Sequence, residues 1–432
     1  MLKIRKLKST DLIYILFLLC DIKFFYLFRL PPVFGGDTAT NRILACVFVA
    51  ITMTAVVIKN KGIVLKTWGK EIIFFELFIV IQMIFSIIRY PKISMGNVIY
   101  TMLPYGLLIF YLVAVNVKDV NYLQWTQITT YISIINSALL LFQVWYLRNV
   151  NYKFFLKIEQ ILRLYGRNTT QYRIFSVVEG FSRFSIILSI ALILSDENKN
   201  KKSNLVNIIL TFIAIVTIDR SRMYVVSMVS CSVLMIVYHY RLSLKRIKKN
   251  HLYVGVVCIA FGAIIFHKSL LPLIVSMMES WNSGSDGSGF ARIAGYQYYL
   301  GVALTHPFLG NGLITPGLNS SYSEIVHARS IFGFNVNYDD VGLIGAMGKL
   351  GIFVAIWYLW CLYKFIRRIK FSSNKDFVIG ASFNLLITMG TMFILDTQRI
   401  DCFVLTLIFS DLFEKINICD KNAERMGTPV IL

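Results

Sequence analysis

Charged residues are scarce in this sequence, and acidic ones are the scarcest. Only 16% of the 432 residues are charged, whereas 56% are hydrophobic and the mean hydropathy is +0.65. Apolar runs recur at nearly the length that crosses a hydrocarbon core of about 30 Å. The composition therefore predicts a polytopic integral membrane protein.

Several motifs that carry chemistry are absent. No CxxC, HExxH or glycine-rich phosphate loop occurs, which argues against the usual metalloprotease and nucleotide-hydrolase interpretations. None of the seven cysteines lies in the polar stretch 274–340, so no disulfide framework is predicted there. No small-residue cleavage site follows a short apolar segment, so the residues from Leu12 onward predict a first span that is retained.

The apolar runs predict an all-α fold with about twelve transmembrane helices in a single membrane domain, 1–432. Asp21, Lys23 and Arg29 interrupt the first of them. The predicted spans are 12–30, 43–58, 72–88, 98–115, 128–146, 176–194, 205–218, 223–239, 252–270, 341–363, 377–395 and 400–413.

The distribution of Lys and Arg predicts the orientation. The N-terminus and the short loops near 59–70, 199–202, 241–249 and 364–370 are basic, and all fall on one side when the spans alternate. Because basic loops are retained in the cytoplasm, both termini are expected to be cytoplasmic and 274–340 to form a long outward loop. These anchors explain much of the net charge of +21, so nucleic-acid binding is not needed to account for it.

A basic outward segment at 147–175 departs from that bias. Lys153, Lys157 and Arg167 alternate with apolar residues such as Phe154 and Leu162, a pattern that suits a helix lying in the headgroup plane. Such a helix either anchors the chain to lipid or helps to hold an anionic lipid-linked substrate.

The long outward loop carries polar, glycine-containing motifs that lipid would not tolerate. Its apolar and aromatic stretch 291–305 predicts a helix on the membrane surface. The motifs are Phe290-Ala291-Arg292, His306-Pro307-Phe308-Leu309-Gly310-Asn311-Gly312 and Tyr338-Asp339-Asp340-Val341-Gly342. Function is therefore expected at this loop.

Three motifs in order resemble a known family. Thr217-Ile218-Asp219-Arg220-Ser221-Arg222 ends a span, Arg292 precedes the His306–Gly312 motif, and Asp340-Val341-Gly342 opens a helix that continues to Gly348-Lys349-Leu350-Gly351. This combination resembles the bacterial O-antigen polymerase and ligase superfamily, and within it the Wzy-type polysaccharide repeat-unit polymerases. The resemblance covers the topology of the chain and, in detail, residues 217–222 and 290–351. It implies a GT-C-like membrane fold.

By this resemblance the chain is expected to be a glycosyltransferase of the bacterial plasma membrane. Such proteins transfer a growing O-antigen, capsule or exopolysaccharide glycan from undecaprenyl diphosphate to a lipid-linked acceptor at the outer leaflet. The implied partners are the undecaprenyl-diphosphate-linked oligosaccharide, membrane lipid, a chain-length regulator and a flippase, and no cofactor or metal is implied. An O-antigen ligase, a lipid-linked oligosaccharide flippase or other transporter, and a non-catalytic scaffold stay open as alternatives.

Asp340 is the predicted general base. Related ligases place a histidine at the outer end of the helix after the long loop, and here an acid stands in that place, eleven residues before Gly351. This departure favours a polymerase over a ligase. A carboxylate is a weak base unless desolvation raises its pKa. The alternatives are that Asp340 only caps a helix, or that it ligates a metal with Asp339.

Arginines and one histidine are the predicted substrate-binding residues. Arg222 and Arg292 offer guanidinium forks to a diphosphate, although Arg222 also suits a residue that reaches the interface from a span end. Arg173 and Arg183 flank the start of the sixth predicted span. Arg183 is expected to face the protein interior or a watery cavity, or to pair with Glu179. His306 fits a turn better than a catalytic role, but could bond a sugar hydroxyl.

Overall fold

A computed structural model describes residues 7–27, 42–117, 120–150, 162–164, 172–174, 179–195, 200–219, 222–243, 287–314 and 320–425. The first half contains α1 (Ser9–Asp21), η1 (Lys23–Tyr26), α2 (Ile43–Asn60), α3 (Gly69–Arg89), α4 (Met95–Met102), η3 (Leu103–Leu108), α5 (Ile109–Asn116), α6 (Tyr122–Val150), β1 (Leu162–Leu164), β2 (Tyr172–Ile174), α7 (Glu179–Leu194), α8 (Lys201–Ala214) and η5 (Ile215–Asp219). The second half contains α9 (Arg222–Ser243), α12 (Gly287–Thr305), α13 (Ser320–His327), α14 (Arg329–Phe332), η7 (Tyr338–Val341), α15 (Gly342–Leu350), α16 (Phe353–Arg367), η8 (Arg368–Lys370), α17 (Lys375–Gly390) and α18 (Ile400–Arg425).

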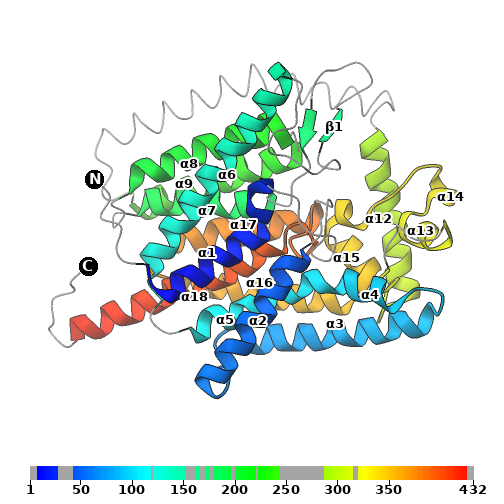
Figure 1. Ribbon diagram of the computed structural model, residues 1–432, viewed down its shortest axis with the longest axis horizontal. Helices are drawn as coiled ribbons and strands as arrows, with labels where there is room; N and C mark the ends of the chain where they lie inside the picture. Colours follow the sequence, from blue (N-terminus) through cyan, green and yellow to red (C-terminus); the bar gives the residue numbers. More distant parts are fainter. Residues whose placement is uncertain are drawn as a thin grey trace.

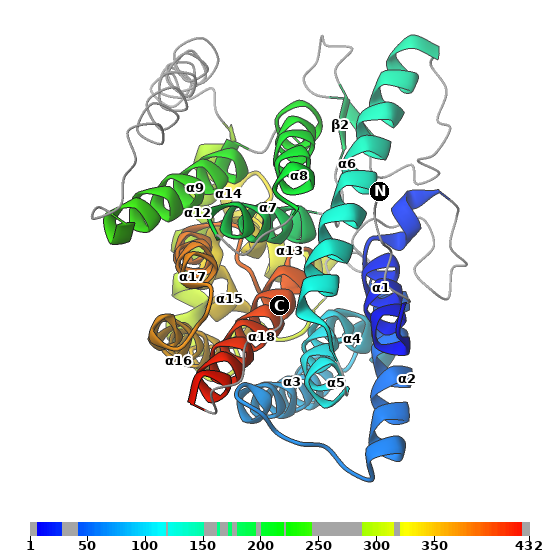
Figure 2. The same ribbon diagram turned by 90° about the vertical axis from the view of Figure 1, so that its left-hand side faces the viewer.

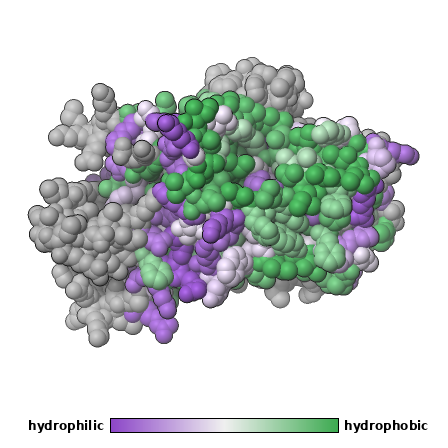
Figure 3. Space-filling view, turned by 90° about the horizontal axis from the view of Figure 1, so that it is seen from below, coloured by the Kyte–Doolittle hydropathy of each residue, from purple (hydrophilic) through white to green (hydrophobic). Residues whose placement is uncertain are grey.

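The protein is a predominantly helical, polytopic membrane protein. Six helical segments among the described residues are long and apolar enough to cross a membrane: 43–60, 69–89, 95–116, 122–146, 201–218 and 224–241. Large apolar side chains cover their outer faces, as on α3, where Phe74, Leu77 and Ile88 are exposed. Figure 3 shows hydrophobic side chains spread over much of one face. Lipid is the solvent that makes such a surface stable.

Helix α7 lies at the centre of the bundle. It packs against α6, α8, α9, α17 and α18, and Figure 2 shows it between these helices. Its residues 180–192 are all buried, so other helices cover it on every side rather than along one stripe. Small polar residues join it to its neighbours, because Ser185 bonds Ser133 at 2.8 Å and Asn207 donates to Ser189 at 2.9 Å.

The predicted spans coincide with helices wherever the structure describes them, but four are shorter or broken. The span at 98–115 consists of α4 and α5, joined by the 3-10 segment η3. The span at 252–270 lies outside the described residues. Helix α1 ends at Asp21 instead of residue 30, and Lys23 and Phe24 then take positive φ. The span at 341–363 is two helices, α15 and α16, separated at Gly351. The span at 377–395 ends at Gly390, because irregular backbone follows from Thr391 to Arg399.

Part of the basic outward segment is a strand pair rather than a helix. Leu162–Leu164 pairs antiparallel with Tyr172–Ile174, with Arg163 opposite Arg173. The prediction that Leu162 belongs to a headgroup helix is therefore wrong. Lys153, Lys157 and Arg167 lie outside the described residues.

The described part of the long loop gathers at one end of the molecule. Figure 1 shows α12, α13 and α14 together on the side away from the end of α18. Helix α12 packs on α15 and on η7, and the prediction of a helix at 291–305 is confirmed by α12. We call this end, together with the segment 391–399, the loop end.

Candidate functional site

Two motifs of the long loop are joined to each other by backbone hydrogen bonds. The amides of Asn311 and Gly312 donate to the carbonyls of Gly348 and Lys349 at 2.7 and 2.8 Å, and the amide of Ile352 donates to Pro307 at 2.7 Å. Gly310 has φ of 56°, and a Cβ there would collide with the Gly348 carbonyl. The turn interpretation of the His306–Gly312 motif is therefore confirmed. The His306 side chain is exposed.

The C-terminal part of α3 holds this turn in place. The Gln82 amide donates to the Leu350 carbonyl at 2.8 Å, and Arg89 donates to the Gly310 carbonyl at 2.7 Å. The Ser86 hydroxyl accepts from the Leu313 amide at 2.8 Å. These bonds satisfy backbone groups that the irregular turn would otherwise leave bare inside the protein, and they fix where α15 begins and ends.

Asp340 lies within a short 3-10 turn, not at the cap of a helix. The turn η7 follows Asn337, and α15 begins at Gly342 with Val341 in the capping position. The Asp340 carboxylate accepts only a long bond, 3.4 Å, from the Asn337 side chain, while its backbone carbonyl accepts from the Thr391 hydroxyl at 2.9 Å. The alternative that Asp340 acts as a helix cap is wrong.

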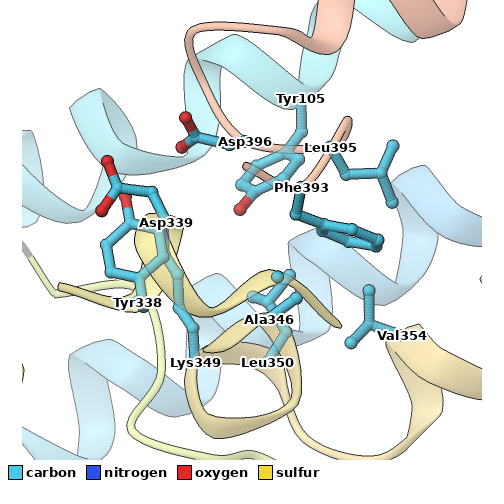
Figure 4. Close-up of a pocket in the computed structure, with 11 residues that line it drawn as sticks. Tyr105, Tyr338, Asp339, Ala346, Lys349, Leu350, Val354, Phe393, Leu395 and Asp396 are labelled. Atoms are coloured by element: carbon cyan, nitrogen blue, oxygen red, sulfur yellow. The ribbon is translucent and has the colours of Figure 1, made fainter. Parts of the chain in front are cut away.

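A small cavity opens beside this turn. Its polar lining consists of Asp339, Lys349, Asp396, Tyr105 and Tyr338, and its apolar lining includes Leu350, Val354, Phe393 and Leu395. Figure 4 shows Tyr338, Asp339 and Lys349 on one side and Phe393, Leu395 and Val354 on the other. The cavity measures about 10 Å³, room for about one water molecule. Asp340 and Arg292 are not among its lining residues.

Lys349 is the most unusual of the lining residues. It is 4% exposed, and its ammonium has no hydrogen-bond partner among the described residues. Its Nζ lies 4.3 Å from the centre of the Tyr338 ring and 5.5 Å from that of Tyr105. The aromatic faces attract the charge but accept none of its three N–H donors, so the site is suited to a ligand oxygen.

Asp339 lines the same cavity as Lys349. Burial raises the pKa of Asp339 to about 7; Asp396 and Asp340 add to the rise, and Arg399 opposes it. A carboxylate with a pKa near neutrality is much better suited to accept a proton than an exposed one. Asp339 is the residue directly before Asp340, the base that the sequence predicted.

The segment between α17 and α18 adds a buried ionic network. Asp396 pairs with Arg399 at 2.9 Å. One turn later, Asp401 accepts from Arg42 at 3.1 Å, and Arg42 also pairs with Asp21. These contacts join α1, α2 and α18 at the loop end, and they explain why α1 can end at a buried Asp21.

Arg183 faces the protein interior, as its depth in the sixth span predicted. It is 2% exposed, its guanidinium lies 4.5 Å from the Tyr224 ring, and NH1 reaches Asn384 at 3.5 Å. Its Nε has no hydrogen-bond partner among the described residues. The Glu179 side chain is not described, so the suggested pairing with Glu179 stays a prediction.

The structure describes fewer contacts for the other predicted arginines than for Arg183. Arg292 lies on α12 close enough to Tyr296 to lower its pKa against the rise that burial causes. The Tyr296 hydroxyl bonds the Gly390 carbonyl, next to the Thr391 that bonds Asp340, so the end of α17 receives contacts from both segments. Arg222 begins α9 and Arg173 lies in β2, but their side chains are outside the description.

His327 is held by the loop itself. Its Nδ1 lies 3.0 Å from the Val336 carbonyl, and its own carbonyl accepts from the Val336 amide at 2.9 Å. In the part of the chain that is described, no group of three or more His, Cys, Asp and Glu side chains could hold a metal. Asp339 and Asp340 therefore lack a third such ligand there.

Comparison with known proteins adds no family: no family model and no curated protein matches this chain. The site must be interpreted from its own geometry.

Sequence reasoning missed Lys349, Asp396 and Arg399. Lys349 was read only as part of a family-like motif, although a lone lysine inside an apolar run is a signal of function in a membrane protein. The stretch Asp396-Thr397-Gln398-Arg399-Ile400-Asp401 places three charges in six residues between two apolar runs. Charged residues so close to apolar runs are likewise a signal of function in a membrane protein.

Proposed function

We propose that this protein is a membrane glycosyltransferase that polymerises polysaccharide repeat units. It transfers a glycan from undecaprenyl diphosphate to a lipid-linked acceptor, with the loop end facing the outer leaflet of a bacterial plasma membrane and both termini in the cytoplasm. The observation that carries the proposal is the set of buried and partly buried charges at the loop end. It comprises the buried cations Lys349, Arg183 and Arg399, the buried carboxylate of Asp396 and the partly buried carboxylate of Asp339.

Glycosyl transfer from a lipid diphosphate needs this combination. An acceptor hydroxyl must lose a proton, so a carboxylate of raised pKa is required. The leaving diphosphate gains negative charge, which fixed cations stabilise most strongly where water is excluded. Arg183, Arg292, Arg222 and Arg173 are the candidates for that second task, because a guanidinium keeps its charge and bonds phosphate oxygens in pairs.

The position of the charges favours surface chemistry over transport. Transporters place their substrate sites near the bilayer midplane, between repeats. Here two buried cations that pair with no carboxylate among the described residues, Lys349 and Arg183, lie in α15 and in the first turns of α7, both at the loop end. A polymerase is favoured over a ligase because acids, not a histidine, precede α15.

The test is polymerisation by the purified protein. Reconstituted in nanodiscs and given synthetic undecaprenyl-diphosphate repeat units, it should produce a ladder of products that differ by one unit. A ligase would instead extend only a lipid A core acceptor. A flippase would move labelled units across vesicles without joining them.

In cells, Arg292→Ala should accumulate single lipid-linked units on the outer leaflet. The matched control is Arg367→Ala, an exposed arginine at the end of α16, which should leave the polymer unchanged. Accumulation of units on the inner leaflet would contradict the proposal and favour a flippase.

A further inference from the structure

The cavity beside η7 is too small for a sugar ring or a diphosphate. With about 10 Å³, it holds one oxygen atom with its hydrogen. Lys349 and Tyr338 also line a second cavity of the same size, on the side of Tyr299 and Asn311. A ligand can therefore place a single oxygen next to the Lys349 ammonium while the rest of it lies outside.

The charges around the cavity determine which kind of ligand oxygen binds there. Lys349 offers N–H donors that no described residue accepts, and Asp339 and Asp396 line the same cavity with carboxylates. A phosphate oxygen would be attracted by one ammonium but repelled by two carboxylates. A hydroxyl fits better, because it accepts from the ammonium and donates to a carboxylate at the same time.

We propose that this cavity is the acceptor-hydroxyl site, in which Asp339 is the catalytic base and Lys349 binds the attacking oxygen. The inference rests on the proposed function and assigns one part of its site. Asp396 is less suited to be the base, because its carboxylate is already paired with Arg399 at 2.9 Å.

The reaction balances with these groups. The acceptor oxygen attacks the anomeric carbon and forms the new glycosidic bond, while the bond from that carbon to the diphosphate oxygen breaks. The electron pair of the broken bond leaves with undecaprenyl diphosphate. The hydroxyl proton passes to the Asp339 carboxylate, which later releases it to water.

The backbone geometry supports this assignment over Asp340. Lys349 is held by the bond from the Gly312 amide to its carbonyl, and η7 is tied to the end of α17 through the Asp340 carbonyl and Thr391. Asp339 and Lys349 are thereby fixed on two elements, η7 and α15, that line one cavity. Asp340 instead directs its carboxylate to the Asn337 amide.

The experiment compares variants in the polymerisation assay with purified protein in nanodiscs. Asp339→Asn should lower kcat by about 10²- to 10⁴-fold, the usual contribution of a general base, with binding of the undecaprenyl-diphosphate donor unchanged. The activity of the wild type should fall below about pH 7, and this acid limb should be lost in Asp339→Asn.

Lys349→Met should raise the KM for the acceptor by about 10- to 150-fold, because losing one hydrogen bond to a charged group weakens binding by that factor. The KM for the donor should not change. Lys92→Met is its control, because Lys92 is exposed after α3 at the same end of the molecule. Donor binding by each variant shows that it is folded.

The outcomes separate the two proposals. No ladder from the wild type would overturn the polymerase and this inference together. A wild-type ladder with full activity in Asp339→Asn, and loss in Asp340→Asn, would overturn only the inference and return the base to Asp340. A rise in donor KM in Lys349→Met, with acceptor KM unchanged, would also overturn it, since Lys349 would then bind the diphosphate.

Discussion

The buried cations at the two ends of the molecule are treated differently. At the end away from the loop, the buried Arg368 in η8 pairs with Asp411 at 2.6 Å and also with Glu414, and the partly exposed Lys364 pairs with Glu71. At the loop end, the Lys349 ammonium has no hydrogen-bond acceptor among the described residues, and Arg183 has a long bond to Asn384 and the ring of Tyr224. Cations that the described residues pair with carboxylates are structural, whereas cations that they leave without a carboxylate are available to a ligand.

Exchange of one buried arginine at each end tests this difference most strongly. Arg368→Met leaves Asp411 and Glu414 without their cation, so it should destabilise the protein by about 3–5 kcal/mol. Arg183→Met removes a buried charge that no described carboxylate pairs with, so it should leave the stability equal or higher while lowering polymerisation by 100-fold or more, about 2.7 kcal/mol. Thermal unfolding in detergent and the ladder assay measure the two effects. Equal destabilisation by both variants would remove the distinction.

The joined motifs at the loop end provide the next test. Gly310→Ala should destabilise by about 2 kcal/mol or more, because the residue has φ of 56° and faces the Gly348 carbonyl. The control is Gly301→Ala in α12, where nothing lies within 4 Å of the added carbon; it should stabilise the helix by up to about 1 kcal/mol. Thermal unfolding measures the stability of both variants. Equal stability of Gly310→Ala and Gly301→Ala would show that the turn does not need its glycine.

The titration of Asp339 predicts an effect on stability that depends on pH. Its pKa is raised in the folded protein to about 7, so the protonated form is favoured by folding. The free energy that the protonated carboxyl group contributes to stability is fully present below about pH 4 and is lost as the pH rises through about 7. Asp339→Asn should therefore be as stable as the wild type at pH 4 and more stable at pH 8, by up to about 4 kcal/mol. A difference that grows toward acid pH would contradict the assignment.

The smallest effect is expected for the partly exposed ion pair of Lys364 and Glu71. Both side chains are partly accessible to solvent, and such pairs contribute about 0–1 kcal/mol. Lys364→Met should lower the stability by no more than that and leave the polymerisation rate unchanged. A large loss would mean that the end away from the loop also depends on a charge for function.

Much of the helix pattern could be predicted from the sequence, because apolar length and period depend on local composition. The predicted spans of α2, α3 and α9 agree with the helices to within four residues at each end, whereas α6 begins six residues before its predicted span. The breaks were harder to predict. Gly351 ends α15 because residues 307–312 pair with its last turn, and that pairing joins segments about forty residues apart.

At the site, too, some features follow from the sequence and others only from the tertiary structure. The sequence by itself determined that the chain lies in a membrane and that its unusual polar residues gather in and around one loop, since hydropathy is a property of each residue. Only the tertiary structure decided that Asp339 rather than Asp340 faces a cavity, and that Lys349 and Asp396 complete it. Burial and charge proximity set the chemistry of a carboxylate, and both depend on contacts between η7, α15 and the segment before α18, which no local pattern specifies.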